Sequence, residues 1–155
     1  MTPARAVGVV LCSALLSACA TGSSQTATSD EVIAARQKHM KEQGAAMRSI
    51  SDKLKAGQVQ AIAPDAEKLV QSAKELPKLF PVGSVNPAIS RAKPDIWQKK
   101  AEFDGYARTL ETKAAQVATT ARTGDAPATQ AAVADMGKTT CTACHDNFRG
   151  PEIKK

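Results

Sequence analysis

The chain has 155 residues, enough for one globular domain with a core of its own but too few for two domains of ordinary size. Only five residues are aromatic, and the sequence is rich in Ala, Lys, Gln and Glu, a composition that favours helices. The formal net charge of +6 is modest and no basic block is interleaved with aromatic residues, which argues against a nucleic-acid partner.

Residues 1–18 are predicted to be a bacterial lipoprotein signal peptide rather than part of the fold. Arg5 provides a short positive region, and the apolar run over 6–16 is too short to span a bilayer. The run closes with Leu-Ser-Ala-Cys over 16–19, which resembles the lipobox in which the signal is cut before a cysteine that is then acylated. We therefore expect a periplasmic protein tethered to a bacterial membrane by lipidated Cys19. The alternative is ordinary cleavage near Ala18 or Ala20, which leaves Cys19 as a spare thiol.

Residues 19–29 are small and polar with nothing to bury, so we expect a lipidated cysteine followed by a flexible tether. A first helix is then predicted from 30 to about 56, with Ser29 as its N-cap and Gly57 after its end. Gly44, inside this helix, costs about 1 kcal/mol relative to Ala. It indicates either a bulky group against the backbone or a close helix crossing. The inward positions recur every seven residues, as in a helix bundle: Ile33, Met40, Met47 and Leu54.

Three more helices are predicted along the chain. The second begins near Pro64 and ends at Pro77, and the proline-rich stretch 77–93 is a long loop. The third runs from Pro94 to Gly124, and the fourth begins at 126 or 127 and stops at Gly150. The predicted fold class is therefore all-α, an antiparallel up-down-up-down four-helix bundle over residues 30–150 with a tail over 151–155.

The strongest chemical signal lies near the C-terminus, where Cys141 and Cys144 are three residues apart and His145 follows directly. This CxxCH spacing is the signature of covalent c-type haem attachment. On a helix both thiols project from one face, so they can form thioether bonds to the two vinyl groups of one porphyrin while His145 binds the iron. The remaining cysteines fit this scheme, because Cys12 leaves with the signal peptide and Cys19 takes lipid.

Two other uses of the cysteine pair fit less well. A thiol-disulfide enzyme places its pair at a helix N-terminus in a βαβ context, whereas this pair lies late in a helix. A zinc site needs a fourth ligand, and a second cysteine pair is absent from the sequence.

The bundle topology selects a candidate for the second axial ligand of the iron. Because the first and last helices are antiparallel, His145 should lie level with the first few turns of the first helix. Met40 lies on the inward stripe about 15 Å from the start of that helix, and Met47 lies roughly 10 Å farther along. His39 is about 100° off the stripe and is expected to face solvent. The residues alone leave Met40 either as a ligand or as a core methionine.

Three segments resemble the class II c-type cytochromes, the cytochrome c-prime family. They are CTACHDNFR over 141–149, PDIW over 94–97 and RQKHM over 36–40, and the resemblance extends over residues 30–150. The family contains c-prime members with a five-coordinate haem that bind nitric oxide and carbon monoxide. It also contains low-spin c-556-type members that carry electrons. MKEQG over 40–44 and LPKLFP over 76–81 are more similar to the second group.

The resemblance implies one covalent haem c with His145 and Met40 as axial ligands. It also implies that Arg36 pairs with a haem propionate, although taken alone this arginine is equally a solvated charge. The predicted function is one-electron transfer to an unidentified redox partner protein, without enzymatic turnover. The alternative is a five-coordinate haem that binds nitric oxide or carbon monoxide. Family members include monomers and dimers, so a homodimer is also considered.

Overall fold

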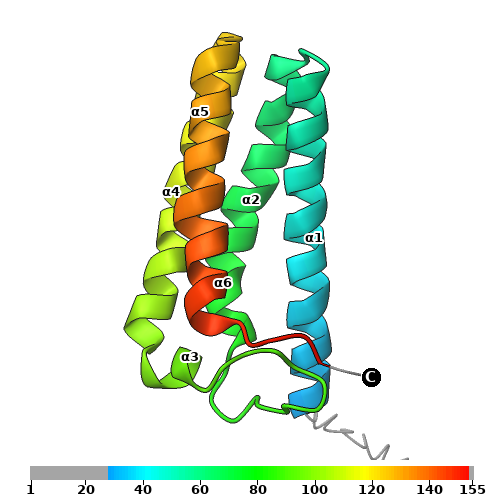
Figure 1. The fold of residues 1–155 in the computed structure, drawn as a ribbon, viewed down its shortest axis with the longest axis vertical. Helices are drawn as coiled ribbons and strands as arrows, with labels where there is room; N and C mark the ends of the chain where they lie inside the picture. Colours follow the sequence, from blue (N-terminus) through cyan, green and yellow to red (C-terminus); the bar gives the residue numbers. More distant parts are fainter. Residues whose placement is uncertain (1–27, 154–155) are drawn as a thin grey trace, which may run out of the picture.

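The computed structural model describes residues 28–153, in which α-helices form a four-helix bundle. In Figure 1, α1 (Ser29–Lys55) runs up, α2 (Ala63–Glu75) down and α4 (Lys100–Thr123) up. The fourth column runs down and consists of α5 (Ala126–Met136), η3 (Gly137–Thr142) and α6 (Ala143–Phe148). Short elements connect the columns: η1 (Val59–Ile62), η2 (Leu76–Leu79) and α3 (Asp95–Gln98). The predicted all-α up-down-up-down bundle is confirmed. The predicted signal peptide and Cys19 lie outside the described residues.

Helix α1 begins one residue earlier than predicted, because Thr28 rather than Ser29 is its N-cap. The Thr28 hydroxyl accepts a hydrogen bond from the backbone N–H of Glu31 at 3.3 Å, and the Glu31 carboxylate accepts one from the N–H of Thr28 at 2.8 Å. This reciprocal capping box satisfies donors that the first turn of a helix leaves open. The predicted end is correct, since Gly57 follows with a φ of 70°, a conformation that favours glycine.

Two predicted helices are interrupted. The third breaks at Lys99 (φ −113°, ψ 43°), which separates the single turn of α3 from α4. Trp97 on α3 donates from its indole N–H to the carbonyl of Pro81 at 2.8 Å, so this turn is held against the long loop rather than in line with α4. The fourth helix contains a π-helical segment, η3, in which the Thr140 hydroxyl donates to the carbonyl of Met136 at 2.6 Å.

The core is divided into two parts along the bundle. The upper part in Figure 1 is built mainly from alanines and aliphatic side chains of α2, α4 and α5, including Ala66, Leu69, Ala114, Val117 and Ala132. The lower part is aromatic and contains Leu76, Phe80, Ile96, Phe103, Ala107 and Phe148. In the lower part, Phe103 packs edge-on against Phe80 and Phe148, at centroid distances of 4.6 and 5.5 Å.

The long loop closes the lower end of the bundle by joining the start of α1 to the end of α6. Backbone hydrogen bonds connect it to the C-terminal segment, from the N–H of Gly150 to the carbonyl of Arg91 at 2.7 Å and from the N–H of Lys93 to the carbonyl of Phe148 at 3.0 Å. Within residues 28–153, no helix is both long enough and apolar enough to cross a membrane.

Candidate haem-binding site

A cavity of about 460 Å³ lies between the N-terminal half of α1 and α6, and a smaller one of about 140 Å³ lies beside it toward the core. Both cavities are lined by Met40 and Gly44 of α1 and by Cys144 and His145 of α6, and Cys141 lines the smaller one. Helix α1 packs against α2, whereas its lower half stands apart from α6 in Figure 1. The space therefore lies where the sequence predicts a haem.

The two cysteines are positioned by different kinds of helix. Cys141 belongs to the π-helical segment, while Cys144 and His145 lie in the first turn of α6. Both thiols are free and half-buried. Because π-helical segments in α-helices often occur at functional sites, η3 is a local feature that fits the role of Cys141, the first residue of the attachment motif.

The electrostatics of the site keep both Cys144 and His145 uncharged. Burial, and after it the neighbouring Cys141, raise the pKa of the Cys144 thiol to about 11. A protonated thiol is a poor nucleophile, which is the opposite of what a thiol-disulfide enzyme needs. Burial also lowers the pKa of His145, as do the positive charges of Arg149 and Arg91, while Asp146 opposes them. The imidazole is thus neutral near pH 7, the form that binds a metal.

Gly44 keeps one wall of the cavities open, one turn after Met40. A Cβ atom at position 44 would meet only the guanidinium of Arg48, on the same helix, at 3.4 Å. Within residues 28–153 no other helix comes within 4 Å of this point, so the described chain makes no close helix crossing at Gly44. The glycine instead leaves α1 without a side chain beside Met40, where a planar group has room.

Arg36 is buried, with 3% of its surface exposed, and is not a solvated charge. Its guanidinium donates to the Ser84 hydroxyl at 3.2 Å, to the Ser84 carbonyl at 2.8 Å and to the Ser90 hydroxyl at 2.9 Å. It also lies 4.9 Å from the centroid of the Phe80 ring and 5.8 Å from that of Trp97.

All of these Arg36 partners are neutral, and burial lowers the pKa of the guanidinium. Arg36 is thus a buried cation on the wall of the larger cavity, and it pairs with no carboxylate in the described chain. Such a cation can bind an anionic group inside the cavity. Two thiols, a neutral imidazole and this cation around the two adjoining cavities fit a haem c, whose iron supplies redox and ligand-binding chemistry. Cys141 and Cys144 would hold the porphyrin, His145 its iron and Arg36 a propionate.

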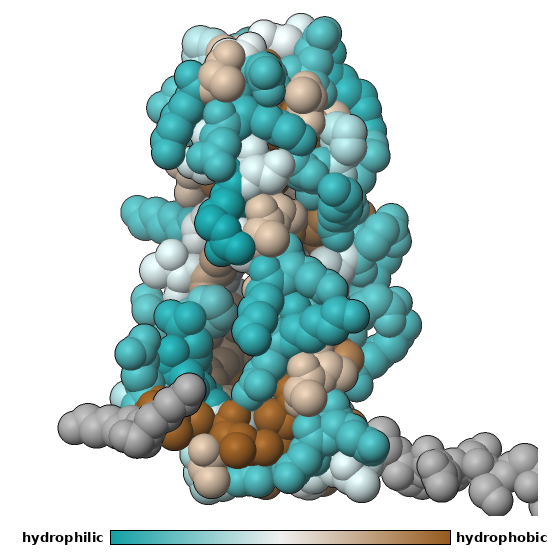
Figure 2. Space-filling model, turned by 90° about the vertical axis from the view of Figure 1, so that its right-hand side faces the viewer, coloured by the Kyte–Doolittle hydropathy of each residue, from teal (hydrophilic) through white to brown (hydrophobic). Residues whose placement is uncertain are grey.

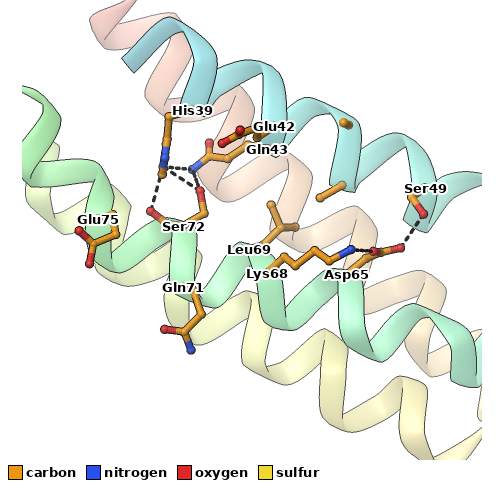
Figure 3. A pocket seen from close by; sticks show the side chains of 12 residues that line it. His39, Glu42, Gln43, Ser49, Asp65, Lys68, Leu69, Gln71, Ser72 and Glu75 are labelled. Carbon is orange, nitrogen blue, oxygen red and sulfur yellow. Dashed lines mark hydrogen bonds and ion pairs between the residues drawn. The ribbon is translucent and has the colours of Figure 1, made fainter. Parts of the chain in front are cut away.

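The prediction that His39 faces solvent is wrong, and His39 lines neither of these cavities. It is half-buried between α1 and α2, where its Nε2 lies 2.7 Å from the Ser72 hydroxyl and 3.0 Å from the Ser72 carbonyl (Figure 3). Gln43 joins the same group, donating to the Ser72 hydroxyl at 2.9 Å. His39 lies on a separate groove of about 560 Å³, so it is not available on the haem side.

The same groove contains a buried carboxylate, Asp65, which accepts hydrogen bonds from Ser49 at 2.5 Å and Lys68 at 2.9 Å (Figure 3). It accepts a third hydrogen bond from Lys53 at 2.5 Å. Burial by itself would raise the pKa of Asp65. The hydrogen bonds from Lys53, Ser49 and Lys68 and the charge of Lys53 outweigh it and hold this pKa well below its usual value. The cluster joins the upper half of α1 to α2 and is a structural contact.

Ser84 and Ser90 were not predicted as part of the site. They lie in a stretch of small residues and prolines, and only their contact with Arg36 distinguishes them from other loop serines. Among residues 28–153, no group of three or more His, Cys, Asp or Glu side chains gathers as a metal site made of side chains alone would require.

Comparison with known proteins places the site in a family. The family model described as Cytochrome C' matches residues 31–149. The cytochrome c' of Rhodopseudomonas palustris is 34% identical over 133 residues, which are 83% of this chain and 88% of that protein. The crystal structure of cytochrome c' from Thermochromatium tepidum has a TM-score of 0.68 at 31% identity, covering 81% of this chain and 98% of that one.

A further solved cytochrome c', described as having an unusual ligand-controlled dimer dissociation, has a TM-score of 0.73 at 26% identity. The match covers 81% of this chain and 99% of that one. The cavity, its CxxCH motif and the extent of these matches lead to one conclusion: the chain belongs to the cytochrome c' family and carries one covalently attached haem c.

Proposed function

We propose that the haem of this protein reversibly binds a small uncharged gas, nitric oxide or carbon monoxide. The observation that carries this proposal is the smaller cavity. It reaches both Met40 and His145, and its walls are formed in large part by apolar side chains, including Leu76 and Leu110. An apolar space beside Met40 and His145 suits a diatomic molecule without charge, because such a ligand gives up little hydration on entering.

The polar side chains of the smaller cavity are engaged with neighbouring protein groups. Gln43 donates to Ser72 at 2.9 Å, and the Thr140 hydroxyl donates to a carbonyl of its own helix at 2.6 Å. The Tyr106 hydroxyl accepts from Asn147 at 2.9 Å. Because these groups are already paired, they favour an uncharged ligand over one that needs several hydrogen bonds.

Family membership also supports gas binding over the predicted electron carrier. The c-prime members of the family bind nitric oxide and carbon monoxide, and one solved relative at 26% identity is described as having a ligand-controlled dimer dissociation. The c-556-type assignment rests on short segments around Met40 and Leu76 alone.

The low-spin electron carrier remains a second candidate because of the position of Met40. This methionine lines both cavities together with His145 and is half-buried on the wall that α1 contributes. In this case its thioether would close the sixth position of the iron and leave no site for a gas.

Visible spectra of the oxidised and reduced protein, with and without carbon monoxide, separate the two functions. Gas binding predicts prompt, tight carbon monoxide uptake and no sulfur-to-iron charge-transfer band in the oxidised wild type. It also predicts that Met40→Ala leaves the spin state unchanged. The matched control is Met47→Ala, on the same stripe but packed against the alanine-rich part of the core. A charge-transfer band that disappears only in Met40→Ala would contradict gas binding and support the electron carrier.

We further propose that the protein is exported to the periplasm and held at a membrane by lipidated Cys19. The lipobox resemblance supports this, as does the start of α1 at Ser29, ten residues later in the chain. Membrane and soluble fractions of cells that express Cys19→Ser test it, with Cys12→Ser as the matched control. The protein should leave the membrane fraction only in Cys19→Ser; retention there would refute the anchor.

A homodimer is proposed on the strength of the relative with ligand-controlled dimer dissociation. The groove between α1 and α2 is the surface we assign to the dimer, since small residues such as Ala45 line it and give a neighbouring helix close access. Sedimentation of Ala45→Glu against Ala115→Glu, an exposed position on α4, tests this. Unchanged sedimentation of Ala45→Glu would refute the interface.

A further inference from the structure

The most exposed large hydrophobic side chains of the described residues gather at one end of the bundle. They are Val82, Val85, Ile89 and Ile153, with exposed fractions of 93%, 44%, 41% and 40%, and we refer to them as the apolar tip. The first three belong to the loop between η2 and α3, and Ile153 follows α6. Figure 2 shows hydrophobic surface gathered at this lower end, below a largely hydrophilic face. Monomeric proteins rarely leave such a grouping uncovered without a use for it.

The loop is held in place, so the exposure of the tip is not the result of a loose segment. Ser84 and Ser90 alternate with the exposed residues and point inward, where Arg36 donates hydrogen bonds to both. Gln37 of α1 donates to the carbonyl of Ile89 at 2.6 Å. The backbone is thus fixed from α1, and the apolar side chains are directed outward.

The charges of the loop suit contact with an anionic surface. Between Glu75 and Asp95 the chain contains no acidic residue, whereas it contains Lys78, Arg91 and Lys93. Lys78 pairs with Glu75 at 2.9 Å and Arg91 with Glu152 at 3.8 Å, while Lys93 pairs with no carboxylate of the described residues. An apolar surface flanked by cations matches the boundary between acyl chains and phosphate headgroups in a bacterial membrane.

The N-terminal end of the chain favours a membrane over other partners of the tip. Helix α1 begins at the same lower end, where Asn86 of the loop donates to Asp30 at 3.1 Å. Cys19 precedes Thr28 by nine residues, which span at most about 30 Å even when fully extended. A lipid on Cys19 would therefore keep the tip close to the bilayer.

We propose that the apolar tip inserts into the headgroup region of the membrane that holds the Cys19 lipid. This inference rests on the proposed anchor. A tethered second contact is effectively intramolecular, so a small apolar surface is sufficient to hold one orientation. Ser90 and Arg91 line the larger cavity directly above the tip, so this orientation holds the cavity mouth at the membrane surface. Uncharged gases are more soluble in the apolar bilayer than in water, so this orientation places the cavity mouth where the gas concentration is higher.

A spin label on Val82→Cys tests the proposal in the lipidated holoprotein, in vesicles of phosphatidylcholine and phosphatidylglycerol. With the other cysteines lipidated or bound to haem, the new thiol is the only one free. Residue 130, an exposed glutamine on α5 in the opposite half of the bundle, gives the matched control Gln130→Cys. We expect the ratio of oxygen to nickel-chelate accessibility to rise by roughly an order of magnitude at 82 and to stay unchanged at 130.

Two outcomes would overturn the proposal. A label at 82 that remains as accessible to the chelate as the label at 130 means that the tip stays in water. A label protected from both reagents in the absence of vesicles, and released on dilution, means that a second copy of the chain covers the tip.

The failure of the anchor is distinguishable from the failure of the tip. If Cys19→Ser does not change the membrane fraction, the anchor is refuted, and the same label is measured on Cys19→Ser holoprotein mixed with the same vesicles. A raised ratio of oxygen to nickel-chelate accessibility in that mixture would show that the tip contacts the membrane without the lipid. A ratio like that of the label at 130 would overturn the membrane contact of the tip.

Discussion

Replacing Arg36 with glutamine tests whether this buried cation is retained for the haem. In the haem-free protein, two terms of opposite sign should nearly cancel. The guanidinium makes three hydrogen bonds, at 3.2, 2.8 and 2.9 Å, and a bond to a charged group contributes about 1.5–3 kcal/mol. Burying a cation without a counter-charge costs several kcal/mol. Arg36→Gln should therefore change the stability of the haem-free protein by only about 1 kcal/mol.

In the haem-bound protein the same substitution should cost more. A propionate beside Arg36 supplies the missing negative charge, and removing the cation leaves that carboxylate unpaired in a poorly solvated place. The loss of one partner of a buried ion pair costs about 3–5 kcal/mol. The difference between the two forms, roughly 2–4 kcal/mol, is the coupling between Arg36 and the haem.

Urea unfolding of both forms measures this coupling, with Cys141→Ala and Cys144→Ala combined to prevent haem attachment. Arg48→Gln, an exposed arginine on the same helix, is the control and should stay within about 0.5 kcal/mol of the parent. Equal destabilisation of the haem-free and haem-bound proteins by Arg36→Gln would refute the reasoning, because Arg36 would then serve only to hold the loop.

Three other substitutions or measurements test the site and its surroundings. Asp65→Asn should lower the free energy of unfolding by about 2 kcal/mol at pH 7. The pKa of Asp65 is lowered in the fold, so its contribution to the free energy of unfolding is present above its ordinary pKa of about 4 and is lost as the pH falls below that value. The free energies of unfolding in urea at pH 3 and pH 7 should therefore differ less in Asp65→Asn than in the parent. In the haem-free protein, the rate of Cys144 alkylation, followed by mass spectrometry, should be slow at pH 7 and should increase with pH to a midpoint near the thiol pKa of about 11. A midpoint near 8.5 would contradict this. Gly44→Phe should fill the cavity and abolish haem attachment while Gly44→Ala retains it, as measured by the haem absorbance per chain; equal attachment in both would show that no haem approaches this wall.

Features of this fold that depend on neighbouring residues were predictable, and those that depend on distant contacts were not. Gly57, Pro64 and Gly124 end or begin helices through their own backbone preferences, so the helix boundaries near them could be predicted. The break at Lys99 could not, because it depends on the hydrogen bond between Trp97 and Pro81, sixteen residues apart. Nor does any known side-chain pattern distinguish the π-helical segment from an α-helix.

The same distinction holds at the site. Cys141, Cys144 and His145 are adjacent in sequence, and their spacing alone indicated the chemistry. Ser84 and Ser90 act through Arg36, 48 and 54 residues away, and no local signal marks them. His39 was misplaced because one inward stripe was assigned to α1, whereas this helix has two covered sides, one facing α2 and one facing the cavity.

The division of the core into two parts has a consequence for how the protein is assembled. The alanine-rich half contains none of the cavity residues except Leu110, so its packing can form before any cofactor is present. The aromatic half surrounds the space that the cofactor fills: Phe80, Phe103 and Phe148 line the larger cavity, and Phe148 follows His145 by three residues. Haem attachment should thus add contacts mainly to the aromatic half and leave those of the alanine-rich half unchanged. The lower half of the bundle is therefore the part whose stability should depend on the cofactor, and the upper half the part whose stability should not.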